Sequence, residues 1–211
     1  MKSVSSASLA GAAGLIKSYG IDPGELARLA EIEPEALDCT DMILDGRNVL
    51  GFFESAAQAC NERYFGIELA HRQGLEVLGS VWLMARHAGT LGEALDNISE
   101  AMQLYTDAIM LRGVPEKQGV AFCYDTVIGD ASGEVQSIEL AFALLCREVR
   151  AHAGKGWQPG YVQFRHAPPP SPNRHRQEYG RALQYNQDRN ALLVDHNTLQ
   201  LPLQTRDRFY R

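Results

Sequence analysis

The sequence predicts an α+β fold, with several helices packed on an antiparallel sheet of about four to five strands. Three observations support this prediction. Apolar residues recur at helical steps of three and four over most of the chain up to Ala108. The pattern then changes to strand-like alternation around a turn that holds Pro115 and Gly119. A long helix and further short strands follow, so helices and strands are grouped as in α+β folds.

The composition suits one domain, which we place at residues 1–203. The chain has 211 residues, of which 45% are hydrophobic and 22% are charged, as in ordinary globular proteins. No apolar run approaches the roughly 20 residues that span a bilayer, and the polar first residues do not form a signal peptide. The four cysteines have no CxxC spacing, which indicates reduced thiols. We therefore expect a cytoplasmic protein with no membrane association.

The net charge of −6 bears on possible partners. Nucleic-acid affinity depends largely on Lys and Arg side chains that neutralise phosphates, and an acidic domain supplies few of these. A stand-alone DNA-binding function is therefore not expected.

Four helices are predicted in the first third of the chain. The first covers residues 8–19, which are mostly small and apolar. Asp22 and Pro23 have the residue types of an N-cap and a first helical position, so a second helix begins there. Residues 48–64 carry one apolar stripe, and residues 64–71 continue as a short helix.

The clearest helix begins at a capping box. In Thr90-Leu91-Gly92-Glu93, the Thr and Glu side chains would each accept a hydrogen bond from a free backbone amide. The helix that follows extends to Ala108. A shorter helix is expected over residues 80–87, and residues 74–79 are expected to form a loop.

A hairpin and a buried helix form the predicted centre of the fold. The hairpin strands are expected at residues 109–114 and 120–127, and alternation places Phe122 and Tyr124 on one face. Residues 134–152 form a helix that is apolar around most of its circumference, which is typical of a buried element. The last part of the chain adds a strand at 161–165, a proline-rich surface loop at 168–172, a helix at 174–183, and strands at 184–186 and 191–194.

No catalytic or metal-binding motif is present. The sequence has no GxSxG, Walker A, GxGxxG or HExxH pattern. Cys123 and Cys146 lie among apolar residues, which favours structural thiols over nucleophiles. His71 and His87 lie on predicted helices without a partner at ligand spacing. We therefore expect a protein that is not an enzyme and carries no cofactor or metal, while a cysteine- or histidine-dependent hydrolase and a haem or gas sensor stay open as alternatives.

Aromatic and polar residues of the best-defined elements indicate a small-molecule site. If the helices cover the hairpin, these side chains converge on an apolar cavity with a few polar groups, the usual composition of such sites. Arg86 shares a helix face with Trp82 and would bind a carboxylate if it faced the cavity. The candidate ligand-binding residues are Trp82, Arg86, Tyr105, Phe122, Tyr124 and Phe142. For each of them, ordinary core packing is the alternative.

Several segments in order resemble a known domain. They are Tyr64-Phe65-Gly66-Ile67-Glu68-Leu69-Ala70, Leu78-Gly79, Thr90-Leu91-Gly92-Glu93-Ala94-Leu95, the strand Tyr161–Arg165, and Arg189-Asn190-Ala191-Leu192 through Leu201-Pro202-Leu203. Together they resemble the arabinose-binding-like N-terminal domain of AraC-family transcription regulators, over most of the chain from about Leu9 to Leu203. Where the family often has a Ser-Pro pair before its Thr-Leu-Gly, this chain has Arg86-His87-Ala88-Gly89.

The resemblance implies a domain that senses a small-molecule effector and forms a homodimer. In that family a C-terminal helix-turn-helix domain follows and binds promoter DNA. Nothing after Leu203 resembles such a domain, and residues 204–211 are expected to begin a connector to it. DNA would then be bound only through that further domain.

Overall fold

The computed structural model describes residues 2–126 and 133–203, and only the backbone of residues 103–105. The predicted Val127 end of the hairpin and the predicted connector at 204–211 lie outside this part.

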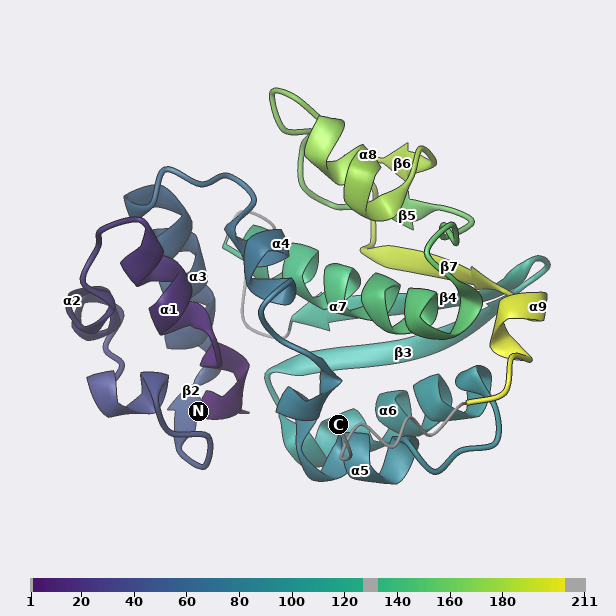
Figure 1. Cartoon of the computed structure of the whole chain (residues 1–211), viewed down its shortest axis with the longest axis horizontal. Coiled ribbons are helices and arrows are strands. Elements are labelled where there is room, and N and C mark those ends of the chain that lie inside the picture. Colours follow the sequence, from purple (N-terminus) through teal and green to yellow (C-terminus); the bar gives the residue numbers. More distant parts are fainter. Residues whose placement is uncertain (1, 127–132, 204–211) are drawn as a thin grey trace.

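A five-stranded sheet covered by helix α7 forms the centre of the molecule (Figure 1). Its strand order is β3-β4-β7-β5-β6, and every neighbouring pair is antiparallel except β5 with β6, which is parallel. The strands are β3 (Ile109–Glu116), β4 (Gly119–Thr126), β5 (Val162–Gln163), β6 (Leu183–Gln184) and β7 (Ala191–Asp195). The predicted α+β class and the number of strands are confirmed, and the one parallel pair corrects the purely antiparallel expectation.

The helices are grouped around this sheet. In Figure 1, α1, α2 and α3 form a separate group to the left of α7, α5 and α6 lie below the sheet, and α8 lies above it. The helices are α1 (Ala12–Ser18), α2 (Pro23–Leu29), α3 (Gly46–Ala59), α4 (Phe65–Ala70), α5 (Ser80–Ala85), α6 (Leu91–Tyr105), α7 (Val135–Ala153), α8 (Asn173–Tyr179) and α9 (His196–Leu199). Among the described residues, none of these helices has the length and apolarity needed to cross a membrane.

The capping box at the start of α6 is confirmed. The Glu93 amide donates to the Thr90 hydroxyl at 3.2 Å, and the Thr90 amide donates to the Glu93 carboxylate at 3.3 Å. The Gly89 amide also donates to this carboxylate, at 2.8 Å. Glu93 therefore fixes both the loop before α6 and the first turn of the helix.

Several predicted boundaries differ from the structure by a few residues, including the end of α6 at Tyr105 instead of Ala108. Three of the differences have a local structural reason. The first helix begins at Ala12, because Gly11 adopts a left-handed conformation with φ 80°. Residues 74–79 do not form a plain loop, since the 3-10 helix η3 (Leu75–Leu78) packs against the core. Helix α8 ends at Tyr179, because Gly180 has φ 83°.

A second, two-stranded sheet was not predicted. Strand β1 (Ser3–Ser5) pairs antiparallel with β2 (Ile43–Asp45), and these strands are too short to show a periodic pattern. The remaining single-turn elements are the 3-10 helices η1 (Ser6–Leu9) and η2 (Pro34–Leu37). The N-terminal residues are thus tied to the body of the fold.

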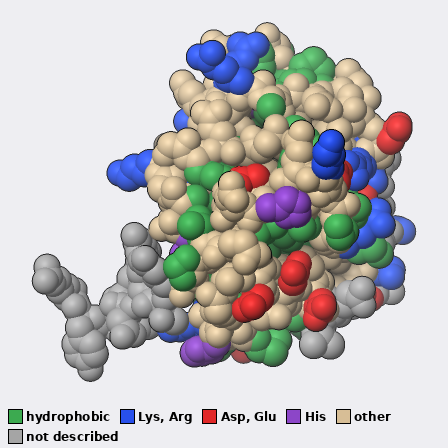
Figure 2. Space-filling model, turned by 90° about the vertical axis from the view of Figure 1, so that its right-hand side faces the viewer, with side chains coloured by type: hydrophobic (Ala, Val, Ile, Leu, Met, Phe, Trp, Pro, Cys, Tyr) green, Lys and Arg blue, Asp and Glu red, His purple; other side chains and the backbone are tan. Residues whose placement is uncertain are grey.

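Charged side chains of both signs are mixed on the surface, as Figure 2 shows for one face. Many of the arginines of the described part are held by carboxylates, and these pairs occupy donors that a phosphate would otherwise use. The paired arginines are Arg63, Arg112, Arg150, Arg165, Arg174 and Arg189.

Helix α4 approaches the start of α7 at Gly66. Its amide donates to the Gln136 side chain at 2.8 Å. A Cβ at residue 66 would lie 2.2 Å from the Gln136 carbonyl oxygen, closer than any carbon can come without movement. The separation of α4 and α7 therefore depends on a residue without a side chain.

The Gly66→Ala variant should lose about 3 kcal/mol or more of unfolding free energy, because a methyl group forces these helices apart. The control is Gly51→Ala on α3, where the residue is exposed and an added Cβ meets nothing within 4 Å. That change should stabilise the protein by about 0.5–1 kcal/mol. Urea denaturation midpoints measure both effects, and equal midpoints for the two variants would contradict this account of the α4–α7 contact.

Candidate functional site

Two apolar pockets with shared lining residues lie between α3, α6, α7 and the hairpin strands, and we call them the two lobes of one apolar cavity. The first lobe has a volume of about 110 Å³ and the second about 90 Å³. Both lobes are lined by Leu78, Met102, Tyr124, Ala141 and Leu144. These shared residues come from η3, α6, β4 and α7, so four separate elements define one site.

The lining of this cavity is almost entirely apolar. No charged side chain lines either lobe within the described part of the chain. The Tyr124 hydroxyl lies 2.8 Å from the Ser137 hydroxyl, and burial raises the pKa of Tyr124. Because either oxygen can be the donor, this neutral pair can turn a donor or an acceptor toward a ligand.

The first lobe extends to the N-terminal residues. The Gln73 side chain donates to the carbonyls of Ser8, at 2.9 Å, and Ala10, at 2.6 Å. Gln73 and Ser8 both line the lobe, together with Val4 and Phe53. The N-terminal segment therefore forms part of the cavity wall.

The structure brings three of the predicted ligand-binding residues together. Phe122, Tyr124 and Phe142 line the second lobe, and the rings of Tyr124 and Phe142 lie edge to face with centroids 6.4 Å apart. Trp82 and Arg86 lie half-buried on or directly after α5, away from the described lining of either lobe. Tyr105 is the last residue of α6, and its side chain lies outside the described part.

Sequence reasoning missed the walls contributed by η3 and the N-terminal segment. Leu75 and Leu78 line the second lobe although residues 74–79 were expected to form a loop. The apolar spacing of Leu75, Val77 and Leu78 between two glycines was the available signal. Nothing local in Val4 or Ser8 predicts contact with the cavity.

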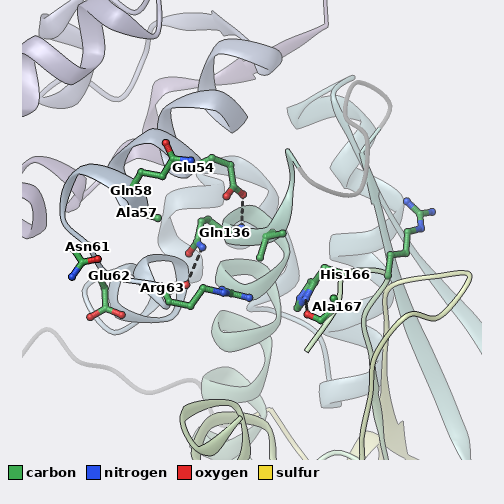
Figure 3. A pocket seen from close by; sticks show the side chains of 11 residues that line it. Glu54, Ala57, Gln58, Asn61, Glu62, Arg63, Gln136, His166 and Ala167 are labelled. Carbon is green, nitrogen blue, oxygen red and sulfur yellow. Dashed lines mark hydrogen bonds between the residues drawn. The ribbon is translucent and has the colours of Figure 1, made fainter. Parts of the chain in front are cut away.

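A second, larger pocket of about 660 Å³ opens near the first turn of α7 (Figure 3). It lies between the end of α3 on one side and the segment after β5 on the other. The side chains around it are mostly polar: Glu54, Ala57, Gln58, Asn61, Glu62, Arg63, Val135, Gln136, Arg165, His166 and Ala167. Figure 3 shows Arg63 and His166 pointing toward each other across its base.

Behind Arg63 and His166 lies a completely buried carboxylate, Glu139 of α7. Its Oε1 atom lies 2.9 Å from Arg63 Nη1, 2.9 Å from His175 Nε2 and 3.6 Å from His166 Nε2. The His175 ring stacks on Phe164, and its Nδ1 lies 2.8 Å from the Tyr185 hydroxyl. A buried carboxylate is costly unless it is paired, and these groups provide the pairing.

Burial shifts the pKa of two groups that line the larger pocket. Burial raises the pKa of Glu54, which accepts a hydrogen bond from the Gln136 amide at 2.8 Å. Burial lowers the pKa of His166, whose Nδ1 donates to the Ala167 carbonyl at 2.9 Å. In neutral His166 the Nε2 atom therefore carries the lone pair, and it has no hydrogen-bond partner in the described structure.

Cys123 and Cys146 are not activated for nucleophilic chemistry. Burial raises the pKa of Cys146 to about 12 and also raises the pKa of Cys123. A thiol with a raised pKa stays protonated at neutral pH and is a poor nucleophile. Among the described residues, no group of three His, Cys, Asp or Glu side chains is arranged to hold a metal ion.

The chain matches the family model described as the arabinose-binding domain of AraC transcription regulators, N-terminal, over residues 20–203. The chain belongs to this family. The AraC-type domain is also 26% identical over 195 residues to the HTH-type transcriptional regulator VirS of Mycobacterium tuberculosis, in strains CDC 1551 / Oshkosh and ATCC 25618 / H37Rv. That match covers 92% of this chain and 57% of VirS, so the chain spans little more than half the length of its relative.

A solved structure has the same fold. The crystal structure of the transcriptional regulator CdpR from Pseudomonas aeruginosa superposes with a TM-score of 0.58 at 13% sequence identity. The superposition covers 85% of this chain and 55% of the CdpR chain. This likeness supports the α+β architecture of the AraC-type domain.

The Glu139→Gln variant should lose about 3 kcal/mol of unfolding free energy, because it leaves Arg63 and His175 facing a neutral group in a buried site. The control is Glu148→Gln on the same helix, where the half-buried carboxylate pairs with a single histidine of the described part, His152, at 3.1 Å. That loss should stay under about 1 kcal/mol. Denaturant titrations that give the two variants the same stability would disprove a special role for the buried carboxylate.

Proposed function

We propose that this AraC-type domain senses a small-molecule effector and that the two-lobed apolar cavity is the effector site. The observation that carries this proposal is that α6, α7, η3 and β4 all contribute to both lobes. A ligand in such a cavity contacts several elements at once and shifts the balance between their arrangements.

The lining favours a neutral apolar effector with one hydrogen-bonding group. A charged ligand would lose its hydration without meeting an opposite charge among the described lining residues. The Tyr124–Ser137 hydroxyl pair is suited to one hydroxyl or carbonyl group of the ligand. A cavity of about 150 Å³ accommodates benzene, so lobes of about 110 and 90 Å³ occupied together suit a compound of one ring or a short alkyl chain.

The geometry offers a route from the cavity to the end of the domain. Residues 201–203 are bound to the start of α6, where the Leu91 amide donates to the Leu201 carbonyl at 2.9 Å and the Leu203 amide donates to the Gly89 carbonyl at 3.2 Å. Further along α6, Leu95, Ile98 and Met102 line the cavity. A shift of α6 would therefore move the end of the domain, and we propose that a promoter-binding helix-turn-helix domain follows there in the whole cytoplasmic regulator.

The cavity proposal is tested with Ala141→Leu, which adds three carbon atoms where both lobes meet. Isothermal titration with 4-methylphenol should detect binding to the unmodified domain and none to this variant. Ala151→Leu, at an exposed position of the same helix, should bind like the unmodified domain. Unimpaired binding by Ala141→Leu would refute the assignment, and equally tight binding of 4-methylbenzoate would refute the preference for neutral ligands.

We further propose that the domain forms a homodimer, as a regulator that reads paired DNA half-sites requires. Sedimentation equilibrium on the purified domain should give the mass of a dimer at high micromolar concentration. A single monomeric species over the same concentration range would count against this part of the proposal.

A further inference from the structure

We propose that the polar pocket beside α7 is a second ligand site and that it binds a small organic cation, such as an amine or a guanidine. This site is separate from the apolar cavity, and the proposal goes beyond effector sensing there. It rests on the volume of the pocket, on which of its charges are already paired, and on the kind of hydrogen-bonding group left without a partner.

The pocket has the size of a small-molecule site. Its volume is about 660 Å³, and small-molecule sites commonly measure about 300–1,000 Å³. It has one wall on α3 and another after β5, as Figure 3 shows with Glu54 and Gln58 on one side and His166 and Ala167 on the other. A ligand there would bridge parts of the chain that are distant in sequence.

The positive charges that line the pocket are already neutralised. Arg63 pairs with Glu139 at 2.9 Å. Arg165 pairs with Glu134 at 3.4 Å and also with Asp125. An anionic ligand would have to compete with these carboxylates for the two guanidinium groups.

The negative charges that line the pocket have no such partner. Glu54 and Glu62 make no ion pair with any side chain in the described part of the chain. Glu54 is half-buried, and only the amides at the start of α7 and the more distant charge of Arg63 favour its ionised form. An ammonium group beside Glu54 would supply the missing counter-charge.

Five buried side-chain atoms of the described part make no hydrogen bond: Arg63 Nη1, both Glu139 carboxylate oxygens, His166 Nε2 and His175 Nε2. Arg63 Nη1 and His175 Nε2 lie 2.9 Å from Glu139 Oε1, so the pocket-lining atom without such a close contact is His166 Nε2, an acceptor. The His166 side chain is only 6% exposed, and its Nε2 lone pair lies 3.6 Å from the Glu139 carboxylate without a hydrogen-bond partner. Two acceptors facing each other are unfavourable, and an N–H donor that bound His166 Nε2 would relieve this. By contrast, the Gln136 side chain is fully used, since it accepts from Gly66 and donates to the Arg63 carbonyl. The free groups therefore complement a ligand that is rich in donors and positively charged.

Three probes of equal chain length separate charge from size. Isothermal titration of the folded domain with 1,5-diaminopentane, 1,5-pentanediol and glutarate should show binding of the diamine alone. The salt concentration should be about 0.15 M, because this screens the general attraction between a cation and a chain of net charge −6. Binding of glutarate, or binding of none of the three, would overturn the proposal.

Glu54→Gln tests the residue assignment, with Glu33→Gln as a control that makes the same charge change at an exposed position outside the pocket. The first change should weaken diamine binding about tenfold or more, as expected when a charge-assisted contact is lost, while the control should not alter it. Equal weakening by both changes would show general electrostatic attraction and would overturn the site. Binding of 4-methylphenol, the probe for the apolar cavity, should be unchanged in Glu54→Gln, so the two proposals fail independently.

Two further measurements keep the test decisive if Glu54→Gln weakens the fold by removing a cap from α7. Gln58→Glu adds a negative charge at an exposed position of the pocket rim and should tighten diamine binding about threefold or more.

In the unmodified domain, diamine binding should weaken as the pH falls through the raised pKa of Glu54, since protonation removes the charge. The other titratable or charged groups that face or influence Glu54 are Glu139 and Arg63, with the α7 amides at Val135 and Gln136. No tightening in Gln58→Glu, or affinity that does not fall on acidification, would contradict the proposal.

Discussion

The pairing of Glu139 with Arg63 and His175 is the interaction on which the rest of the structure depends. Glu139 lies on the central helix, Arg63 lies between α3 and α4, and His175 lies on α8. One buried carboxylate therefore connects the N-terminal helices, the central helix and the last part of the chain. Because a buried charge tolerates few arrangements, it fixes the position of α7 more strictly than apolar contacts would.

The position of α7 determines both cavities. Residues 135 and 136 line the polar pocket, while Ser137, Leu140, Ala141 and Leu144 face the apolar cavity. The two sites therefore lie along adjacent stretches of one rigid element. The contact at Gly66 sets how close α4 comes to the same helix, so a change in helix separation would reach both sites together.

Elements with strong local patterns were predictable from the sequence, and contacts between distant segments were not. The buried helix at 134–152 and the alternation through Phe122 and Tyr124 correctly placed three residues of the apolar cavity. The polar pocket had no local signal, because Glu139 meets His166 and His175 only after the chain has passed through α7 and β5. In the sequence, Glu139 is one of several polar residues of a mostly apolar helix, and its partners are polar residues far away in the chain.

The bonds that join residues 201–203 to the start of α6 make this segment part of the same folding unit. The β-bridge between Thr90 and Pro202 and the bond from the Leu91 amide to Leu201 make these last described residues part of the capped helix start. Shortening the chain to Gln200 would leave the Leu91 amide without its acceptor and remove the bond from the Leu203 amide to the Gly89 carbonyl. For exchange of this domain between regulators, the junction should therefore follow Leu203. Each transferred domain then keeps the segment that is hydrogen-bonded to the start of its own helix α6.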